Sequence, residues 1–193
     1  MKFCKRDRLA EERKYAGADD FRQVFTNDRD RLYELAFLLA GDMEKAERII
    51  GAGLEDSVKS TGVFKDWAHN WAKHTVIQNA IRLVNPQPRV DADFYVPESL
   101  FTTFKALNIQ DREIALPRIL DLAEFDRFVF VITVLEHYSD HDCALLLSAF
   151  FRDVRHSRLR AMRNIAVLEN GEASFVESTP PERARPQLQV QVS

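Results

Sequence analysis

Helical spacing is the feature that most restricts what this chain can fold into. Apolar residues recur every three or four positions, and almost no segment alternates with the period of two that a half-buried strand requires. Residues 19–42 show this clearly, with Phe21, Phe25, Leu32 and Leu39 at helical spacing. They are typical of one long amphipathic helix. With six glycines in 193 residues, the sequence predicts an all-α fold.

Capping residues and chain-breaking residues place the next helices. Gly41 is expected to end the first helix, and Asp42 is expected to cap a second helix that follows over residues 43–60. Gly62 then interrupts the chain, and a third helix is predicted over residues 63–84, stopped by "NPQP".

Changes in periodicity divide the chain into five segments and predict two small helical lobes joined by a linker. The predicted segments are a charged N-terminal extension (1–19), a first helical domain (20–85), a proline-bearing linker (86–113), a second helical domain (114–168) and a polar, flexible tail (169–193).

Composition excludes several classes of protein. Apolar residues make up 46% and charged residues 30%, which is typical of a soluble globular protein. A net charge of −3 provides no bulk field that favours nucleic acid or membrane, so any charged surface must be local. Two cysteines fit a reducing compartment, no apolar run approaches the roughly 20 residues that span a bilayer, and the N-terminus lacks a signal-peptide core. The sequence therefore predicts a cytoplasmic protein without a membrane partner.

The stretch "EHYSDHDCALLL" raises the question of a metal site. His137 and His141 lie four residues apart, and zinc favours histidine, cysteine and aspartate ligands. However, Ser139 followed three residues later by Asp142 resembles a capping box, with aspartate in place of glutamate or glutamine. A new helix then starts between the histidines and places them on different elements. We expect a capped helix start and neither a metal nor a cofactor.

The residues around this cap predict a helix-turn-helix. An apolar helix over residues 122–139 precedes a short helix that starts after Ser139. The three residues "SAF" separate this short helix from a second, arginine-rich helix over residues 151–168. Two helices joined by a tight turn, the second of them basic, are typical of a DNA-binding motif.

One arc of the arginine-rich helix carries most of its cations, with apolar residues on the opposite side. We predict that Arg152, Arg155 and His156 face the major groove of duplex DNA. Phosphate contacts are expected from Arg158, Arg160 or Arg163. The alternative is an ordinary solvated face of an amphipathic helix.

Aromatic residues interleaved with cations mark the third helix. Trp67 and Trp71 lie four apart, with Lys65 and Lys73 close by and Phe64 just before them. Such a pattern suits single-stranded DNA, which stacks its bases on aromatic rings and brings phosphates to cations. The alternative is that the tryptophans anchor the hydrophobic core, as large aromatics at helical spacing usually do.

The second lobe resembles region 4 of bacterial sigma factors of the sigma-70 family, in particular the extracytoplasmic-function type. The resemblance covers about 45 residues and includes the stretch "VFVITVL". In this family the region is a helix-turn-helix that reads the minus-thirty-five promoter element. The turn departs from the family, which usually has glycine and then serine or threonine where Ser148 and Phe150 stand. The matching residues are Leu122, Arg127, Ser139, Asp142, Ala144, Leu146, Leu147, Val154, Arg160 and Ala161.

The first lobe resembles region 2 of the same family, in a degenerate form. "GDMEKAE" matches the family's Gly-Asp-x-x-x-Ala-Glu, and the tryptophan helix resembles the one that handles the melted minus-ten strand. The resemblance places a polymerase-binding face at Glu47, Arg48, Gly51 and Ala52. Arg48 stands where the family has an acidic residue, and Gly51 and Ala52 replace a Gln-Glu pair.

Two functions remain open from the sequence. The resemblance implies a transcription initiation factor whose partners are double-stranded promoter DNA and core RNA polymerase. The altered polymerase face favours the alternative, a sigma-like regulator without initiation activity that binds an anti-sigma factor or acts as a stand-alone DNA binder. Gly-rich phosphate loops and nucleophile elbows are absent from the sequence, so we do not expect an enzyme.

Overall fold

The protein is helical throughout the two ranges that its computed structural model describes, residues 14–89 and 112–167. Outside the helices, these ranges contain connecting segments and one isolated antiparallel bridge between Tyr15 and Phe64. The all-α prediction is therefore confirmed. Most of the predicted linker, the first thirteen residues and the predicted tail lie outside the described residues.

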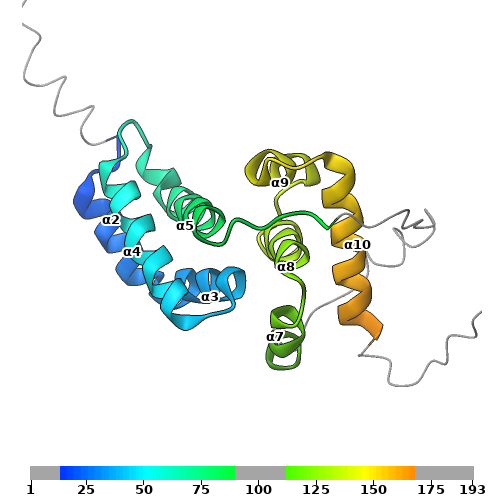
Figure 1. Cartoon of the computed structure of the whole chain (residues 1–193). Coiled ribbons are helices and arrows are strands. Elements are labelled where there is room, and N and C mark those ends of the chain that lie inside the picture. Colours follow the sequence, from blue (N-terminus) through cyan, green and yellow to red (C-terminus); the bar gives the residue numbers. More distant parts are fainter. Residues whose placement is uncertain (1–13, 90–111, 168–193) are drawn as a thin grey trace, which may run out of the picture.

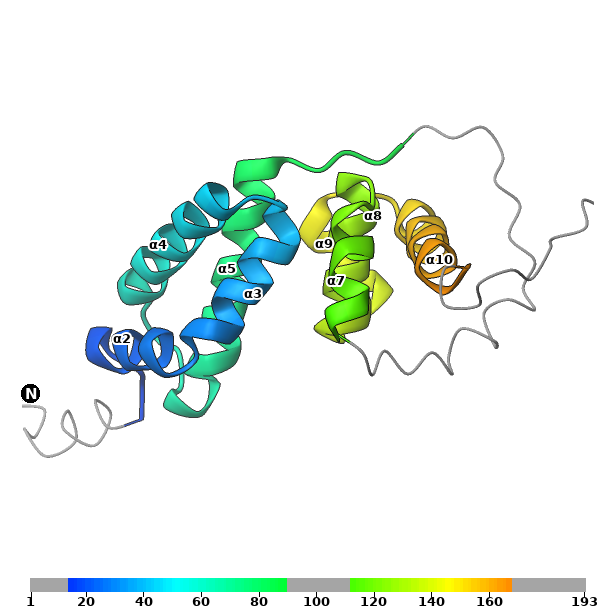
Figure 2. The ribbon, with the colours of Figure 1, turned by 90° about the horizontal axis from the view of Figure 1, so that it is seen from below.

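The helices form two groups that lie side by side, α2 to α5 and α7 to α10, with α3 and α5 on the side nearer α8 (Figures 1 and 2). The elements are α2 (Ala18–Asn27), α3 (Arg29–Ala40), α4 (Met43–Lys59), the 3-10 turn η1 (Lys65–Trp67), α5 (Ala68–Val84), α7 (Arg112–Leu120), α8 (Glu124–Phe130), the π-helical segment η3 (Val131–Leu135), α9 (Asp140–Leu147) and α10 (Phe151–Val167).

The predicted helix ends in the first group are confirmed. Gly41 closes α3 in the left-handed conformation, with φ of 69°. The Asp42 carboxylate accepts a hydrogen bond of 2.8 Å from the backbone N–H of Lys45 and so caps α4. At the other end of the group, Asn85 closes α5 in the left-handed conformation just before Pro86.

Two helix predictions in this group are wrong, and tertiary contacts give the reason. The long helix predicted over residues 19–42 is two helices that meet at Asp28, whose carboxylate lies 2.6 Å from Nδ1 of His69 on α5. The helix predicted over residues 63–84 begins at Ala68. The preceding backbone pairs elsewhere, because the Val63 carbonyl accepts a hydrogen bond of 2.7 Å from the N–H of Ala16.

A single large cluster of buried side chains runs through both groups of helices. It extends from Leu39 of α3 and Val76 of α5 to Phe128 of α8 and Val154 of α10. The two groups are therefore packed against each other in this structure. Their division into two separate domains stays a prediction.

The buried side chain of Arg127, on α8, connects the two groups. Its guanidinium donates hydrogen bonds of 3.3 to 3.4 Å to the carbonyls of Leu39 and Ala40, at the C-terminal end of α3. It also donates to the carbonyls of Leu120 and Leu122, at 3.3 and 3.5 Å. The last carbonyls of a helix have no partner within the helix, so Arg127 satisfies groups that would otherwise be buried without one.

Asp126, the neighbour of Arg127, ties α8 to α10. Its buried carboxylate accepts hydrogen bonds from the hydroxyl of Ser157, at 2.6 Å, and from the guanidinium of Arg160, at 2.8 Å. Burying a charge is costly unless it is paired and hydrogen-bonded, and both conditions hold here.

We expect Arg127→Ala to lower the free energy of unfolding by about 3 kcal/mol or more, because buried carbonyls of α3 lose their donors. Urea denaturation monitored by circular dichroism measures the change. The matched control is Arg82→Ala, which removes an exposed arginine paired with Asp56 and should cost less than about 1 kcal/mol. Equal effects of the two substitutions would contradict the bridging role of Arg127.

Candidate nucleic-acid interface

The helix start at the "HYSDHDC" stretch has the predicted cap. The Ser139 hydroxyl accepts a hydrogen bond of 3.1 Å from the backbone N–H of Asp142, and α9 begins at the next residue, Asp140. The Asp142 carboxylate accepts from the same hydroxyl at 2.6 Å, whereas a complete capping box would bind the backbone N–H of the cap residue.

The two histidines lie on different elements, as predicted. His137 is in the connection between η3 and α9, with φ of 60°, and His141 is exposed in the first turn of α9. Burial raises the pKa of the nearby Cys143 thiol to about 12, as is typical of a structural, buried cysteine. In residues 14–89 and 112–167, no three His, Cys, Asp or Glu side chains are grouped so that they could hold a metal ion.

The turn of the predicted helix-turn-helix lies at residues 148–150, as the sequence indicated. Ser148 ends α9 in the left-handed conformation, with φ of 50°, and α10 starts at Phe151. Glycine adopts this conformation without the steric penalty that a side chain brings. Ser148 therefore adopts a backbone conformation that glycine would adopt at a lower steric cost.

The inner face of α10 packs as predicted, with Val154, Ala161 and Ile165 all buried. Ser157 is buried on the same helix and binds Asp126. These contacts fix which side of α10 faces away from the core.

The predicted groove-facing residues of α10 differ in exposure. The Arg152 side chain is 79% exposed, with its Nε 3.8 Å from the Asp153 carboxylate. Arg155 and His156 are partly buried. Arg152 is therefore the most accessible of the three. The helix α10 that carries it lies on the side of the molecule away from α2 and α4 (Figure 1).

The three predicted phosphate contacts have different surroundings. Arg163 is exposed near the end of α10. The Arg160 side chain is 16% exposed and paired with Asp126, so its charge serves the contact between α8 and α10. Arg158 is partly buried and lies 3.0 Å from Asp140 of α9. Of the three, Arg163 is the most exposed. The arc predicted from the sequence was too broad to separate exposed arginines from partly buried ones.

Sequence reasoning missed a group of exposed apolar side chains around the turn. Phe150 is 77% exposed and Phe151 is 49% exposed, and Leu145 on α9 is also exposed. The signal was present in the sequence, because "SAFF" has an aromatic ring where the sigma-family turn has a small polar residue.

The aromatic residues at the start of α5 form an exposed surface. Trp67 is 64% exposed, and its ring meets the ring of Phe64 edge to face, with centroids 5.6 Å apart. The ring of Tyr15 also packs against Phe64, with centroids 5.0 Å apart, and the ammonium of Lys14 is 5.2 Å from the Phe64 ring centroid. Trp71 is partly exposed and donates a hydrogen bond to Ser60. This exposure favours a contact surface over a role as core anchors.

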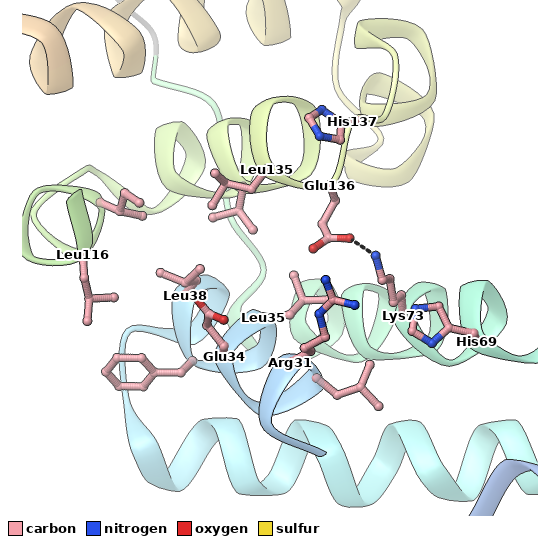
Figure 3. Close-up of a pocket in the computed structure, with 14 residues that line it drawn as sticks. Arg31, Glu34, Leu35, Leu38, His69, Lys73, Leu116, Leu135, Glu136 and His137 are labelled. Atoms are coloured by element: carbon pink, nitrogen blue, oxygen red, sulfur yellow. Dashed lines mark hydrogen bonds and ion pairs between the residues drawn. The ribbon is translucent and has the colours of Figure 1, made fainter. Parts of the chain in front are cut away.

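The predicted cations of this surface are paired within the protein. Lys65 lies 3.0 Å from the Asp20 carboxylate. Hydrogen bonds from the backbone N–H of Gly17 and from the Lys65 ammonium lower the pKa of this carboxyl. Lys73 lies 2.7 Å from Glu136, which belongs to the other group of helices (Figure 3). The aromatic rings are thus a stronger feature of this surface than its charge.

A cleft of about 630 Å³ lies where Lys73 meets Glu136, between α3 and α5 on one side and α7 and η3 on the other. Its lining combines apolar side chains with charged ones such as Arg31, Lys73 and Glu136 (Figure 3). Its lining comprises Arg31, Leu32, Glu34, Leu35, Phe37, Leu38, His69, Lys73, Leu116, Ile119, Val131, Leu135, Glu136 and His137.

The predicted polymerase-binding face lies on the outside of α4. Glu47, Arg48 and Gly51 are exposed and Ala52 is partly buried. A Cβ at position 51 would meet no atom of another segment within 4 Å. In contrast, a Cβ at Gly53 would lie 3.2 Å from Val76 of α5, so that glycine allows close helix packing. Position 51 therefore has open space for a Cβ, whereas position 53 does not.

Comparison with known proteins assigns no family: no protein-family model matches the chain, and no curated protein matches it. Of the helices within the described ranges, none combines the length and the apolar character that a bilayer crossing needs.

We expect Ser148→Gly to raise the free energy of unfolding by about 1 kcal/mol, because glycine removes the steric cost of the left-handed conformation. Urea denaturation measures the gain. Ser148→Ala is the control and should give no gain, since it keeps a Cβ at this position. A stabilisation by alanine equal to that by glycine would show that the backbone at Ser148 is not strained.

Proposed function

We propose that this chain is a sigma-factor-like DNA-binding protein that acts in transcription initiation. The observation that carries the proposal is the helix-turn-helix of α9 and α10. Its first helix is capped by Ser139, its turn passes through Ser148, and its second helix buries Val154 while it exposes Arg152. An arginine at the start of the second helix suits contact with base edges and phosphates in the major groove of a minus-thirty-five element.

The first group of helices carries surfaces that suit the two other contacts of a sigma factor, with the melted minus-ten strand and with core polymerase. The exposed rings of Phe64 and Trp67 suit stacking with bases of the melted minus-ten strand. Glu47, exposed on α4, offers a carboxylate to core polymerase. The first group of helices, which carries the aromatic surface, and α10 lie on opposite sides of the molecule (Figures 1 and 2), so one chain can contact two separated promoter elements.

The alternative function, a sigma-like regulator that does not initiate transcription, is favoured by the polymerase-binding face itself. In the resembled family this face offers carboxylates to a basic clamp. Here Arg48 is exposed and would repel such a clamp, and Gly51 has no side chain to offer. In this case the protein binds an anti-sigma factor or acts on DNA through α9 and α10 alone.

DNA binding tests the proposal directly. The full chain should select a specific duplex from a random pool, and its affinity should fall as salt rises, with a log–log slope of about 0.9 per phosphate neutralised. Arg152→Ala combined with Arg155→Ala should weaken binding at least tenfold, because two major-groove contacts are lost. Arg82→Ala, on α5, is the matched charge control and should bind like the unmodified protein. Unchanged binding by the double variant would remove α10 from the interface.

Polymerase binding separates the proposed function from the alternative. Arg48→Asp combined with Gly51→Gln and Ala52→Glu should strengthen binding to core polymerase, because it restores carboxylate and amide partners for the clamp. Fluorescence anisotropy of the labelled chain measures binding, and a reconstituted transcription assay measures initiation. Tight binding by the unmodified protein, with no gain from the triple variant, would show that Arg48 does not lower the affinity for core polymerase.

A further inference from the structure

Three apolar side chains at the turn between α9 and α10 are exposed to solvent. Phe150 and Phe151 stand next to each other in sequence and are 77% and 49% exposed, and Leu145 on α9 is 67% exposed. Exposed aromatic rings forgo the free energy that burial of their apolar area would provide. Two consecutive exposed aromatic residues beside an exposed leucine are candidates for a contact surface.

The position of the two rings indicates what they contact. Phe150 is the last residue of the turn and Phe151 is the first residue of α10. In a helix-turn-helix, the N-terminal residues of the second helix are the ones that reach base edges in the major groove. The two phenylalanines therefore occupy positions from which side chains read sequence.

DNA and a second copy of this chain are two possible partners for this surface, and charge favours DNA. The residue after Phe151 is Arg152, whose side chain is 79% exposed. A two-fold contact between copies through these rings would bury the Arg152 side chains of both copies, each 3.8 Å from an Asp153 carboxylate, and removing these charges from water is costly. The phosphates beside a major groove attract the same arginine.

The chemistry of phenylalanine then selects the base. A phenyl ring has no hydrogen-bond donor or acceptor, so it cannot read the polar pattern of a base edge. Thymine is the base that carries a methyl group in the major groove, and phenylalanine makes apolar contact with that methyl. We infer that Phe150 and Phe151 are specificity-determining residues that read thymine methyl groups, an inference that rests on the proposed binding of duplex DNA by α9 and α10.

Substitution of deoxyuridine for thymine tests this, because it removes the methyl group and leaves base pairing intact. The duplex selected by the full chain is remade with deoxyuridine at each thymine in turn, and affinities are compared at one salt concentration. Affinity should fall about fourfold at one or two positions, the amount expected for one methyl group removed from an apolar contact.

Two variants link the effect to the rings. Phe150→Ser and Phe151→Ser should each weaken binding to the thymine duplex, and at least one should bind the thymine and deoxyuridine duplexes equally. Met43→Ser is the matched control, since Met43 is an exposed apolar residue on α4, and it should keep the full discrimination. Circular dichroism checks that each variant is folded.

Each other result overturns the inference. Salt-dependent binding that is indifferent to deoxyuridine at every thymine, or a selected duplex without thymine, would refute methyl reading and leave the proposed DNA binding intact. No binding to any duplex would refute both. Light scattering then tells whether the chain forms a dimer that Phe150→Ser disrupts, which would assign the rings to self-association.

Discussion

The buried guanidinium of Arg127 is the contact on which the arrangement of the two groups of helices depends. It donates to the carbonyls of Leu39 and Ala40 at the end of α3 and also to carbonyls just before α8. Gly41 makes this possible, because a Cβ there would lie 3.1 Å from the guanidinium. Burial lowers the pKa of Arg127, yet the side chain stays charged, since arginine starts from a very high value. A charge in this position holds the groups together by satisfying polar backbone that apolar packing would leave unpaired.

Two neighbouring residues of α8 make buried polar contacts with different helices, Arg127 with α3 and Asp126 with Arg160 of α10. Arg127 reaches towards α3, and Asp126 reaches towards α10. As a result α8 lies between the first group of helices and the helix proposed to bind DNA. The surfaces proposed for polymerase and for DNA then lie at opposite ends of the molecule (Figure 1). The same arrangement leaves the aromatic surface of Phe64 and Trp67 and the rings of Phe150 and Phe151 open to partners.

Local signals in the sequence were reliable wherever the physical cause was itself local. Gly41, Asp42 and Ser139 act on backbone groups within a few residues of themselves, and each ends or caps a helix as predicted. The signal failed where a distant contact decided the outcome. The bend at Asp28 accompanies a contact with His69, and the late start of α5 follows from backbone pairing of Val63 with Ala16.

The sequence by itself determined the all-α fold, the locally capped helix ends at Gly41, Asp42 and Ser139, the turn before α10 and the inner face of that helix, because helical period and capping are properties of neighbouring residues. The tertiary structure decided which polar and aromatic side chains are accessible. It paired Arg160 with Asp126 and Lys73 with Glu136, and it left Trp67 and Phe150 exposed. Burial and ion pairing depend on residues far away in the chain, so a single sequence lists candidate contacts, and packing selects among them.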